Sequence, residues 1–171
     1  MKDFIKKYWK FILIELLLIG VVIAADLLTK EFIYGKVERD GKIDIIKGVL
    51  SFTAVRNTGA SFGMFGEHTS ILTIVSAVSA FGLLVFLIFS AKNRNILLRS
   101  SLVLIIGGAI GNLVDRIALK YVRDFVYVEI IDFAVFNLAD SALTVGTILL
   151  IIYVLFFYGK DQSQKPQKES Q

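Results

Sequence analysis

The sequence predicts an all-α membrane protein: four transmembrane helices with a small extracytoplasmic β-sheet and an interfacial loop segment. Of its 171 residues, 56% are hydrophobic, and its mean hydropathy is +0.70. A soluble domain is about half apolar and carries more charge than the 20% found here. Residues 71–91 and 141–159 contain no charged side chain. Each of these runs is long enough to cross a hydrocarbon core of about 30 Å as a helix, so the expected surrounding is lipid.

Four spans are predicted in order along the chain. The first, residues 11–28, carries Glu15 and Asp26, and the third ends with Asp115 and Arg116. The N-terminus has the basic and then apolar character of a secretory signal. Because polar residues and three further apolar runs follow it, it is interpreted as an uncleaved first span. The other three predicted spans are residues 70–91, 98–119 and 140–159.

Lysine and arginine predict the orientation of the helices, since these residues accumulate in cytoplasmic loops. With four spans, three basic segments lie on one side: the N-terminus, the short loop between the second and third spans, and the C-terminal tail. Both termini are therefore expected in the cytoplasm, and the longer loops, residues 29–69 and 120–139, face outward. The basic residues are Lys2, Lys6, Lys7, Lys10, Lys92, Arg94, Arg99, Lys160, Lys165 and Lys168.

The two outward loops contain segments typical of strands. Around residues 49–55, β-branched and aromatic residues nearly alternate, which predicts two or three short strands on the membrane surface. The run "DFVYVEII" at residues 124–131 is either a strand or a short interfacial segment. A single membrane domain is expected over residues 1–160, and the polar tail, residues 161–171, is expected to be disordered.

Composition excludes several classes of site. The chain has no cysteine, so a disulfide or a thiolate metal site is impossible, and its single histidine disfavours a histidine-based metal centre. Metal sites built on thiolates or on several histidines are therefore not expected. The net charge of +4 does not indicate nucleic acid as a partner, because membrane topology accounts for the lysines.

Most of the notable polar residues lie at the outer end of a span. Asp26 and Lys30 are four residues apart, so they share one helix face. Asn112 and Arg116 have the same spacing, and Gly108 extends their stripe as a supporting position. Ionisable groups inside a membrane face the bundle interior and are candidates for function. The spacing therefore predicts a shared polar interior near the outer interface.

Four carboxylates gather beside the fourth span, in residues 121–140. A proton or ion pathway usually spreads polar residues through the membrane depth, whereas these lie at one level. A scaffold subunit would not need so many acids. No serine or cysteine nucleophile with a partner histidine is visible, so the chemistry favours a pair of carboxyls that share a proton and hydrolyse an amide. The four acids are Asp124, Glu129, Asp132 and Asp140.

Structural interpretations stay open for these residues. Asp140 could be a helix N-cap, and Asp26 with Lys30 could form a surface ion pair. Arg116 could snorkel to the interface. Glu15 is expected to be paired inside the bundle or near the inner face. Gly107 and Gly111 form a GxxxG pair, which is expected to allow close helix packing. Glu129, Asp132 and His68 are interpreted as solvated loop residues.

Five motifs resemble those of the bacterial lipoprotein signal peptidase family, also called signal peptidase II. They occur in the family's order and cover nearly the whole chain apart from the tail. Any one of them is weakly specific, but five in order on four spans are highly specific. They are "DLLTK" (26–30), "RNTGASFG" (56–63), "GGAIGNLVDR" (107–116), "VRDF" (122–125) and "FNLADS" (136–141).

The resemblance implies an intramembrane aspartic protease of the bacterial plasma membrane, with its active site at the outer face. Its substrates would be prolipoproteins with a diacylglyceryl-cysteine, cut on the N-terminal side of that cysteine. Membrane lipid is an implied partner, a monomer is expected, and no metal or organic cofactor is required. The outer strands around Asn57 and Phe62 would cover or clamp the peptide.

The resemblance also implies roles for single residues. Asp124 and Asp140 correspond to the family's catalytic aspartates, and Asp115 is expected to be structural. The second "DF", at Asp132 and Phe133, is not the catalytic one. Ala134 stands where many relatives have proline, which concerns loop rigidity rather than chemistry. The implied supporting residues are Asp26, Lys30, Asn57, Asn112, Arg116 and Asn137.

Overall fold

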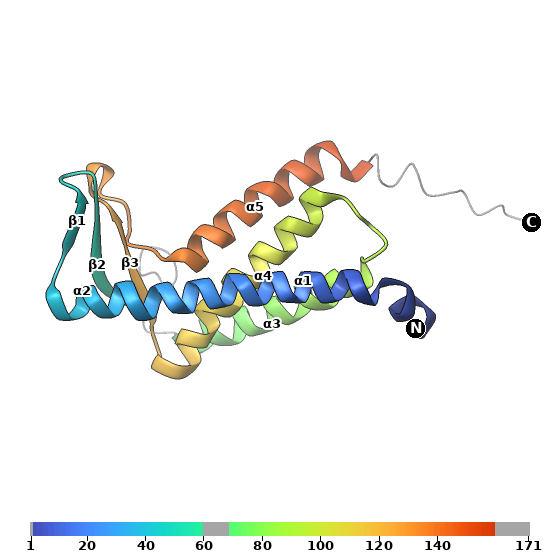
Figure 1. The fold of residues 1–171 in the computed structure, drawn as a ribbon, viewed down its shortest axis with the longest axis horizontal. Coiled ribbons are helices and arrows are strands. Elements are labelled where there is room, and N and C mark those ends of the chain that lie inside the picture. The colour runs from blue at the N-terminus through green and yellow to red at the C-terminus, as the bar shows by residue number, and fades with distance from the viewer. Residues whose placement is uncertain (1, 60–68, 160–171) are drawn as a thin grey trace, which may run out of the picture.

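The computed structural model describes residues 2–59 and 69–159. Four long helices run side by side, and a three-stranded sheet lies across one end of the bundle (Figure 1). Helix α1 begins and α5 ends at the opposite end. The expectations about Phe62, His68 and the tail fall outside the described residues. The helices long and apolar enough to cross a membrane are Lys6–Asp40, Thr69–Phe89, Ile96–Leu119 and Leu138–Phe156.

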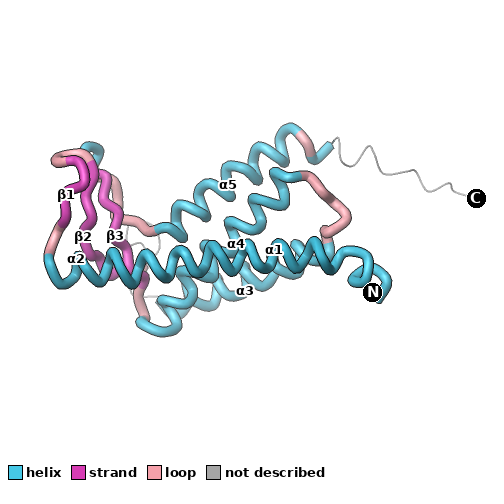
Figure 2. The backbone as a smooth tube through the Cα atoms, in the orientation of Figure 1, coloured by secondary structure: helices cyan, strands magenta, loops and turns pink. Residues whose placement is uncertain are grey.

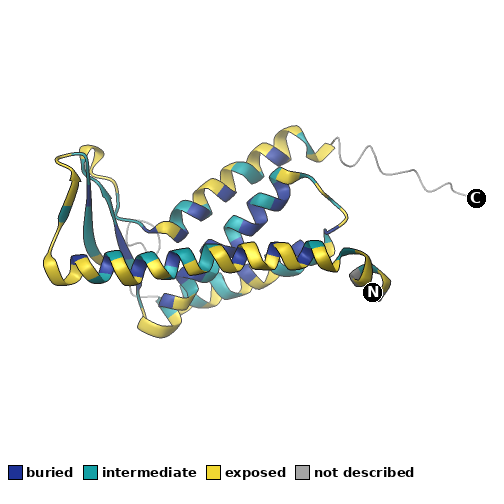
Figure 3. Ribbon diagram, in the orientation of Figure 1, coloured by how far each residue is buried: buried dark blue, intermediate teal, exposed yellow. Residues whose placement is uncertain are grey.

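The outward faces of these helices carry exposed apolar side chains (Figure 3). Leu17 on the first helix is 62% exposed, Val78 on the second is 66% exposed, and Leu155 on the fourth is 69% exposed. In water such surfaces would be an aggregation hazard, but in a bilayer they face hydrocarbon. The prediction of a four-helix membrane protein is confirmed.

The first helical segment is longer than predicted. Helix α1 (Lys2–Thr29) continues through a π-helical turn (Lys30–Tyr34) into α2 (Gly35–Asp40), and it stops at Gly41, whose φ is 88°. The expectation that a loop begins at residue 29 is wrong. The polar pair that seemed to mark the exit of the helix is buried inside the protein, and the first residue in the left-handed region is Gly41.

Helix α4 (Ile96–Leu119) is the centre of the bundle and packs against α1, α3 (Thr69–Phe89) and α5 (Leu138–Phe156). Glycine makes this close approach possible. A Cβ atom at Gly107 would lie 2.7 Å from Val22 of α1, and one at Gly111 would lie 2.6 Å from Asp26 Oδ2. The packing role predicted for the GxxxG pair is confirmed. Gly108 faces α5 instead, where a Cβ would collide with the Ala139 carbonyl, so its contribution is close packing.

The predicted strands are present and form an antiparallel sheet in the order β1-β2-β3 (Figure 2). Residue Val55 of β2 pairs with Asp124 of β3, next to a register shift between Phe52 and Val55. The run "DFVYVEII" divides between β3 and a 3-10 turn at Glu129–Ile131, because the strand ends at Val128. The strands are β1 (Ile43–Ile46), β2 (Leu50–Asn57) and β3 (Val122–Val128).

A buried ion pair lies toward the end of the bundle away from the sheet. The Arg99 guanidinium donates through Nε and Nη2 to the two carboxylate oxygens of Glu15, and also to Ser90 Oγ and the Leu87 carbonyl. Both side chains are 4% exposed. The pairing expected for Glu15 is confirmed, whereas the placement of Arg99 in a loop is wrong. We call Glu15 with Arg99 the closed pair.

Candidate active site

Polar side chains from four separate chain segments meet where the sheet covers the bundle. Asp26 and Lys30 come from the first helical segment, Asn112 from α4, Asp124 from β3, and Asn137 with Asp140 from the start of α5. All six were expected from the sequence, and the structure brings them together through hydrogen bonds. We call these six residues the open cluster: Asp26, Lys30, Asn112, Asp124, Asn137 and Asp140.

Asp124 is buried in the sheet wall of the cluster, with 1% of its surface exposed. Its Oδ1 accepts a hydrogen bond from Asn137 Nδ2 at 2.6 Å, and its Oδ2 accepts one from Asn57 Nδ2 at 2.9 Å. Burial, followed by the negative charge of Asp140, raises the pKa of Asp124 to about 6, although the two amide donors act in the opposite direction. The carboxyl is therefore able to hold a proton near neutral pH.

Asp140 sits in the first turn of α5 as part of a capping box. Its Oδ2 accepts from the Asn137 backbone N–H at 3.1 Å, while Asn137 Oδ1 accepts from the Asp140 N–H at 2.9 Å. The N-cap is therefore Asn137, and the interpretation of Asp140 as an N-cap is wrong. This reciprocal bond leaves Asp140 Oδ1 to accept from Asn112 Nδ2 at 2.7 Å. The helix start thus fixes the direction of the carboxylate.

Two amide side chains connect the carboxylates of Asp124 and Asp140. Asn137 Nδ2 donates to Asp124 and also to Asn112 Oδ1, at 3.1 Å, and Asn112 Nδ2 donates to Asp140. Amide donors orient a carboxylate without neutralising its charge. The two acids are therefore held in one hydrogen-bonded network.

Lys30 determines which way the Asn112 amide points. Its Nζ donates to Asp26 Oδ2 at 2.7 Å and to Asn112 Oδ1 at 2.9 Å. An ammonium can only donate, so the amide oxygen must face Lys30 and the amide nitrogen must face Asp140. Lys30 and Asp26 are both 0% exposed, so the interpretation as a surface ion pair is wrong. Asp26 Oδ1 also accepts from the Ala139 N–H at 2.9 Å, which fastens the start of α5.

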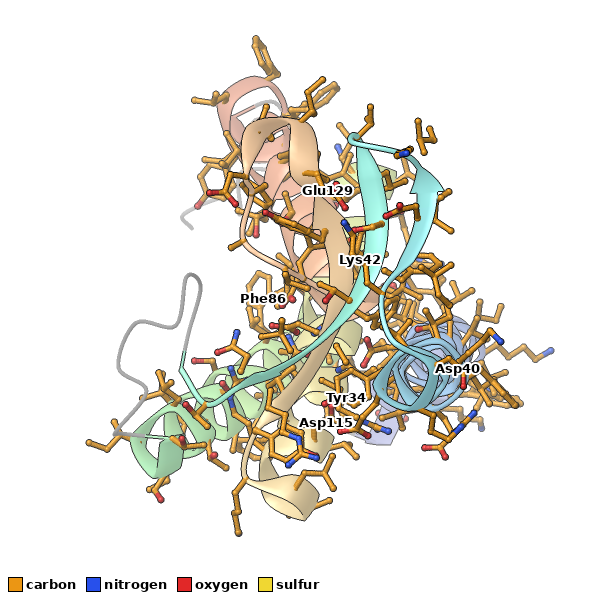
Figure 4. All side chains as sticks on the ribbon, turned by 90° about the vertical axis from the view of Figure 1, so that its left-hand side faces the viewer. Tyr34, Asp40, Lys42, Phe86, Asp115 and Glu129 are labelled. Atoms are coloured by element: carbon orange, nitrogen blue, oxygen red, sulfur yellow. The ribbon has the colours of Figure 1, made fainter. Side chains whose placement is uncertain are left out.

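Asp115 lies beside the open cluster and ties α4 to β3 (Figure 4). Its Oδ1 accepts from Arg123 Nη2 at 2.8 Å, and its Oδ2 accepts from the Arg123 backbone N–H at 3.0 Å. Arg123 directly precedes Asp124, so this contact positions the strand that carries the acid. Arg123 stands within the "VRDF" motif, but nothing in its spacing distinguished it from the other basic residues of the sequence.

A cavity of about 420 Å³ opens against both carboxylates. Arg116 forms part of its wall and donates through Nη2 to the Gly59 carbonyl at 3.1 Å. Its buried Nε has no hydrogen-bond partner among the described residues. Arg116 as a whole is half-buried and lines the cavity, where a guanidinium can donate to an acceptor on a ligand. Other lining residues are Asn57, Asn112, Val122, Phe133, Phe136, Ser141, Thr144 and Val145.

The remaining acids of residues 121–140 do not belong to the open cluster. Glu129 pairs with Lys42 at 2.5 Å near the tip of the sheet (Figure 4), and Lys42 lowers the pKa of this carboxyl. Asp132 is exposed and accepts from the Tyr127 hydroxyl at 2.5 Å. The second "DF" therefore lies apart from the acids of the cluster. In residues 2–59 and 69–159, no group of three or more His, Cys, Asp or Glu residues could hold a metal ion.

Comparison with known proteins gives a consistent result. Residues 18–156 match the family described as Signal peptidase (SPase) II. The lipoprotein signal peptidase of Lactobacillus johnsonii is 40% identical over 82% of this chain and 91% of its own length, and that of Bacillus velezensis is 39% identical over 84% and 94%. A solved bacterial membrane enzyme superposes with a TM-score of 0.75 at 31% identity, over 92% of this chain and 94% of that one.

Proposed function

The chain belongs to the signal peptidase II family, and from that premise we propose that it is an intramembrane aspartic endopeptidase. It removes signal peptides from diacylglyceryl-modified prolipoproteins and cuts before the lipid-modified cysteine. The observation that carries the proposal is the position of Asp124 and Asp140 in one network against one cavity. Asp26, Lys30, Asn57, Asn112 and Asn137 support these two acids.

The reaction needs one proton on the pair of acids. Two adjacent carboxyls titrate as a unit, and a single shared proton lets one act as base while the other acts as acid. The ionised member takes a proton from water, which attacks the scissile carbonyl. The protonated member donates to the carbonyl oxygen, which gives a gem-diol. The other member, now carrying the proton taken from water, gives it to the amine nitrogen as the C–N bond breaks, and the first recovers a proton from a gem-diol hydroxyl. The burial that raises the pKa of Asp124 supports the retention of this proton.

Arg116 positions the substrate. A guanidinium presents several N–H groups in a fixed plane, and one carbonyl of the protein already occupies Nη2. Arg116 as a whole is only half-buried in the cavity wall with the acids, so the guanidinium N–H groups that face the cavity are available to a peptide carbonyl of the substrate. Side chains from α5, among them Thr144 and Val145, line the side of the cavity next to the bundle and suit the signal peptide and the acyl chains.

The proposed orientation places the cavity at the outer interface of the bacterial plasma membrane. Lysines of the N-terminal segment lie at the end of α1 away from the sheet, which favours a cytoplasmic N-terminus. The end of α5 lies at the same end of the bundle, so the C-terminus is cytoplasmic too (Figure 1). We also propose that residues 1–160 form a single domain that acts as a monomer in contact with membrane lipid.

One cleavage experiment tests the proposal. The purified protein in detergent is incubated with a diacylglyceryl-modified prolipoprotein and with the same polypeptide lacking the lipid. Cleavage of the modified form alone, before the cysteine and without any ion gradient, is the expected result. Cleavage at another bond, or activity only in sealed vesicles with a proton gradient, would contradict it. The Asp140→Asn variant purified in parallel controls for contaminating proteases.

A further inference from the structure

A second hollow meets the cavity at Asp124 from the other side. Its volume is about 510 Å³, and it shares Asn57, Asp124 and residues 133–135 with the first cavity. The walls differ beyond that junction. The first cavity continues along α4 and α5, whereas the second continues over the sheet, where it is lined by Val55, Arg56, Thr58, Tyr127 and Asp132. A chain bound across Asp124 would therefore have one part against the helices and the other against the sheet.

The position of the two walls indicates which end of a bound substrate lies over the helices and which end lies over the sheet. In the proposed reaction, the signal peptide and the acyl chains are the apolar parts of the substrate and belong with the membrane helices. The mature polypeptide leaves the membrane and belongs with the sheet. The second hollow thus faces the first residues after the cysteine.

Besides Asp124, the wall of the second hollow contains one charge that is not balanced by an ion pair with a described cation. Arg56 donates to Glu38 Oε1 at 2.8 Å and lies over the Tyr121 ring, so its positive charge already has a partner. Asp132 accepts from the Tyr127 hydroxyl through Oδ1 and forms no ion pair with any described residue. A neutral hydroxyl orients the carboxylate and leaves its charge in place.

The backbone at Asp132 supports a directed role for its side chain. Its φ of 48° and ψ of 45° place it in the left-handed region, which residues other than Gly, Asn and Asp rarely adopt. The Tyr127 hydroxyl then holds the carboxylate at the edge of the hollow. Asn tolerates the same backbone and can accept the same hydrogen bond, so Asp132→Asn removes the charge with little change in shape.

We propose that the second hollow binds the first residues of the mature lipoprotein and that Asp132 makes it select against acidic residues and in favour of basic ones. This inference rests on the proposed function. Asp132 is a specificity residue here and takes no part in bond cleavage. Because the contact is exposed to solvent, the effect is modest: attraction of lysine together with repulsion of glutamate is expected to give about a 3- to 10-fold preference.

The test measures kcat/KM for a series of lipid-modified substrates in a zwitterionic detergent, which has no net charge to bias partitioning. Lysine, glutamine or glutamate is placed in turn at the second, third and fourth residues, counting the cysteine as the first. The wild-type protein is expected to prefer lysine over glutamate by about 3- to 10-fold at one of these positions, less so at high salt. The Asp132→Asn variant is expected to bring that ratio below about 2-fold.

Two matched variants separate this site from general charge effects. Glu129→Gln removes one negative charge from the same loop, but Glu129 is paired with Lys42 outside the hollow, so the lysine preference should persist. Tyr127→Phe keeps the Asp132 charge while removing its hydrogen bond, so the preference should also persist.

The outcomes are distinct. Three results would overturn this inference while cleavage itself continues. The wild type could show no preference for lysine at any of the three positions, the preference could survive in Asp132→Asn, or it could be lost equally in Glu129→Gln. Failure of the wild-type protein to cleave any lipid-modified substrate would instead overturn the proposed function.

Discussion

The closed pair and the open cluster both hold charged side chains that are buried or half-buried in the same bundle, yet they differ in whether protein groups use all of their hydrogen-bonding capacity. In the closed pair, the guanidinium of Arg99 is used by Glu15, Ser90 and Leu87. In the open cluster, amides hold two carboxylates against a cavity, and the neighbouring Arg116 Nε lacks a described partner. Because both groups hold charges away from water, burial alone does not indicate catalysis. The feature that indicates catalysis is the contact of the two carboxylates with a cavity.

The largest effect is expected from removing either acid at the cavity. Asparagine keeps the shape of aspartate but cannot cycle a proton, so Asp124→Asn and Asp140→Asn should each lower kcat by at least about 1,000-fold. Expression in the membrane and the elution profile in detergent should stay as in the wild type. Retention of more than a tenth of the activity by either variant would show that its carboxylate is not needed to move the proton.

A change in the closed pair should act on stability instead. Glu15→Gln leaves the Arg99 guanidinium buried without a counter-charge, which is expected to cost about 3–5 kcal/mol of folding free energy. Thermal unfolding in detergent would measure the loss. The kcat of the fraction that remains folded should match the wild type, since the pair lies away from the cavity. A folded Glu15→Gln protein with a low kcat would break the distinction between the two clusters.

Arg116 should give an intermediate effect on substrate positioning. Lysine keeps the charge but cannot present the planar array of donors, so Arg116→Lys is expected to lower kcat/KM by about 10- to 100-fold. Progress curves over a range of substrate concentrations would measure this loss. Wild-type kinetics in the variant would reduce Arg116 to a side chain that snorkels to the interface.

The smallest expected effect is a shift in titration. The pKa of Asp124 is raised to about 6 by burial first and by Asp140 second. Removing the second cause in Asp140→Asn should lower that pKa, but burial should keep it above the ordinary value of about 3.9. Isotope-edited infrared spectra of the Asp124 carboxyl across a pH series would measure both midpoints. An unchanged midpoint would show that the two acids do not sense each other.

The titration of Asp124 should also determine how kcat/KM depends on pH. Because the mechanism requires one proton on the pair, and Asp124 loses its proton as the pH rises through about 6, kcat/KM should decline above that pH. A profile that climbs steadily from pH 6 to pH 9 would contradict the proton-sharing mechanism.

The sequence was informative wherever regular spacing or a motif encoded position. Apolar runs located the second, third and fourth spans within a few residues but missed the extension of the first to Asp40. The spacing of Asp26 with Lys30 and of Asn112 with Arg116 identified residues that the structure places around one site. The choice of Asp124 over Asp132 came from the "VRDF" motif, because spacing alone could not distinguish four acids in one stretch. The structure gives these two acids different surroundings.

Other features depend on contacts between distant segments and could not be read from local pattern. Arg99 looked like part of a basic loop, but its partner Glu15 lies 84 positions away in the sequence. The helix continues past Lys30 because Asn112 and Asp115 of α4 surround its ammonium group. Arg123 was overlooked for the same reason, since its role depends on Asp115 across the α4–β3 junction.

The central claim is that Asp124 and Asp140 act as one catalytic unit, and a double-variant comparison tests it most directly. Single-turnover cleavage of the lipid-modified substrate, with enzyme in excess, would be measured for both Asp→Asn variants and for the double variant. The rate of the double variant is predicted to match that of either single variant within about threefold, because groups that share one proton fail together. A double variant slower than the singles by the product of their separate losses would show that the two carboxylates act independently and would contradict the account.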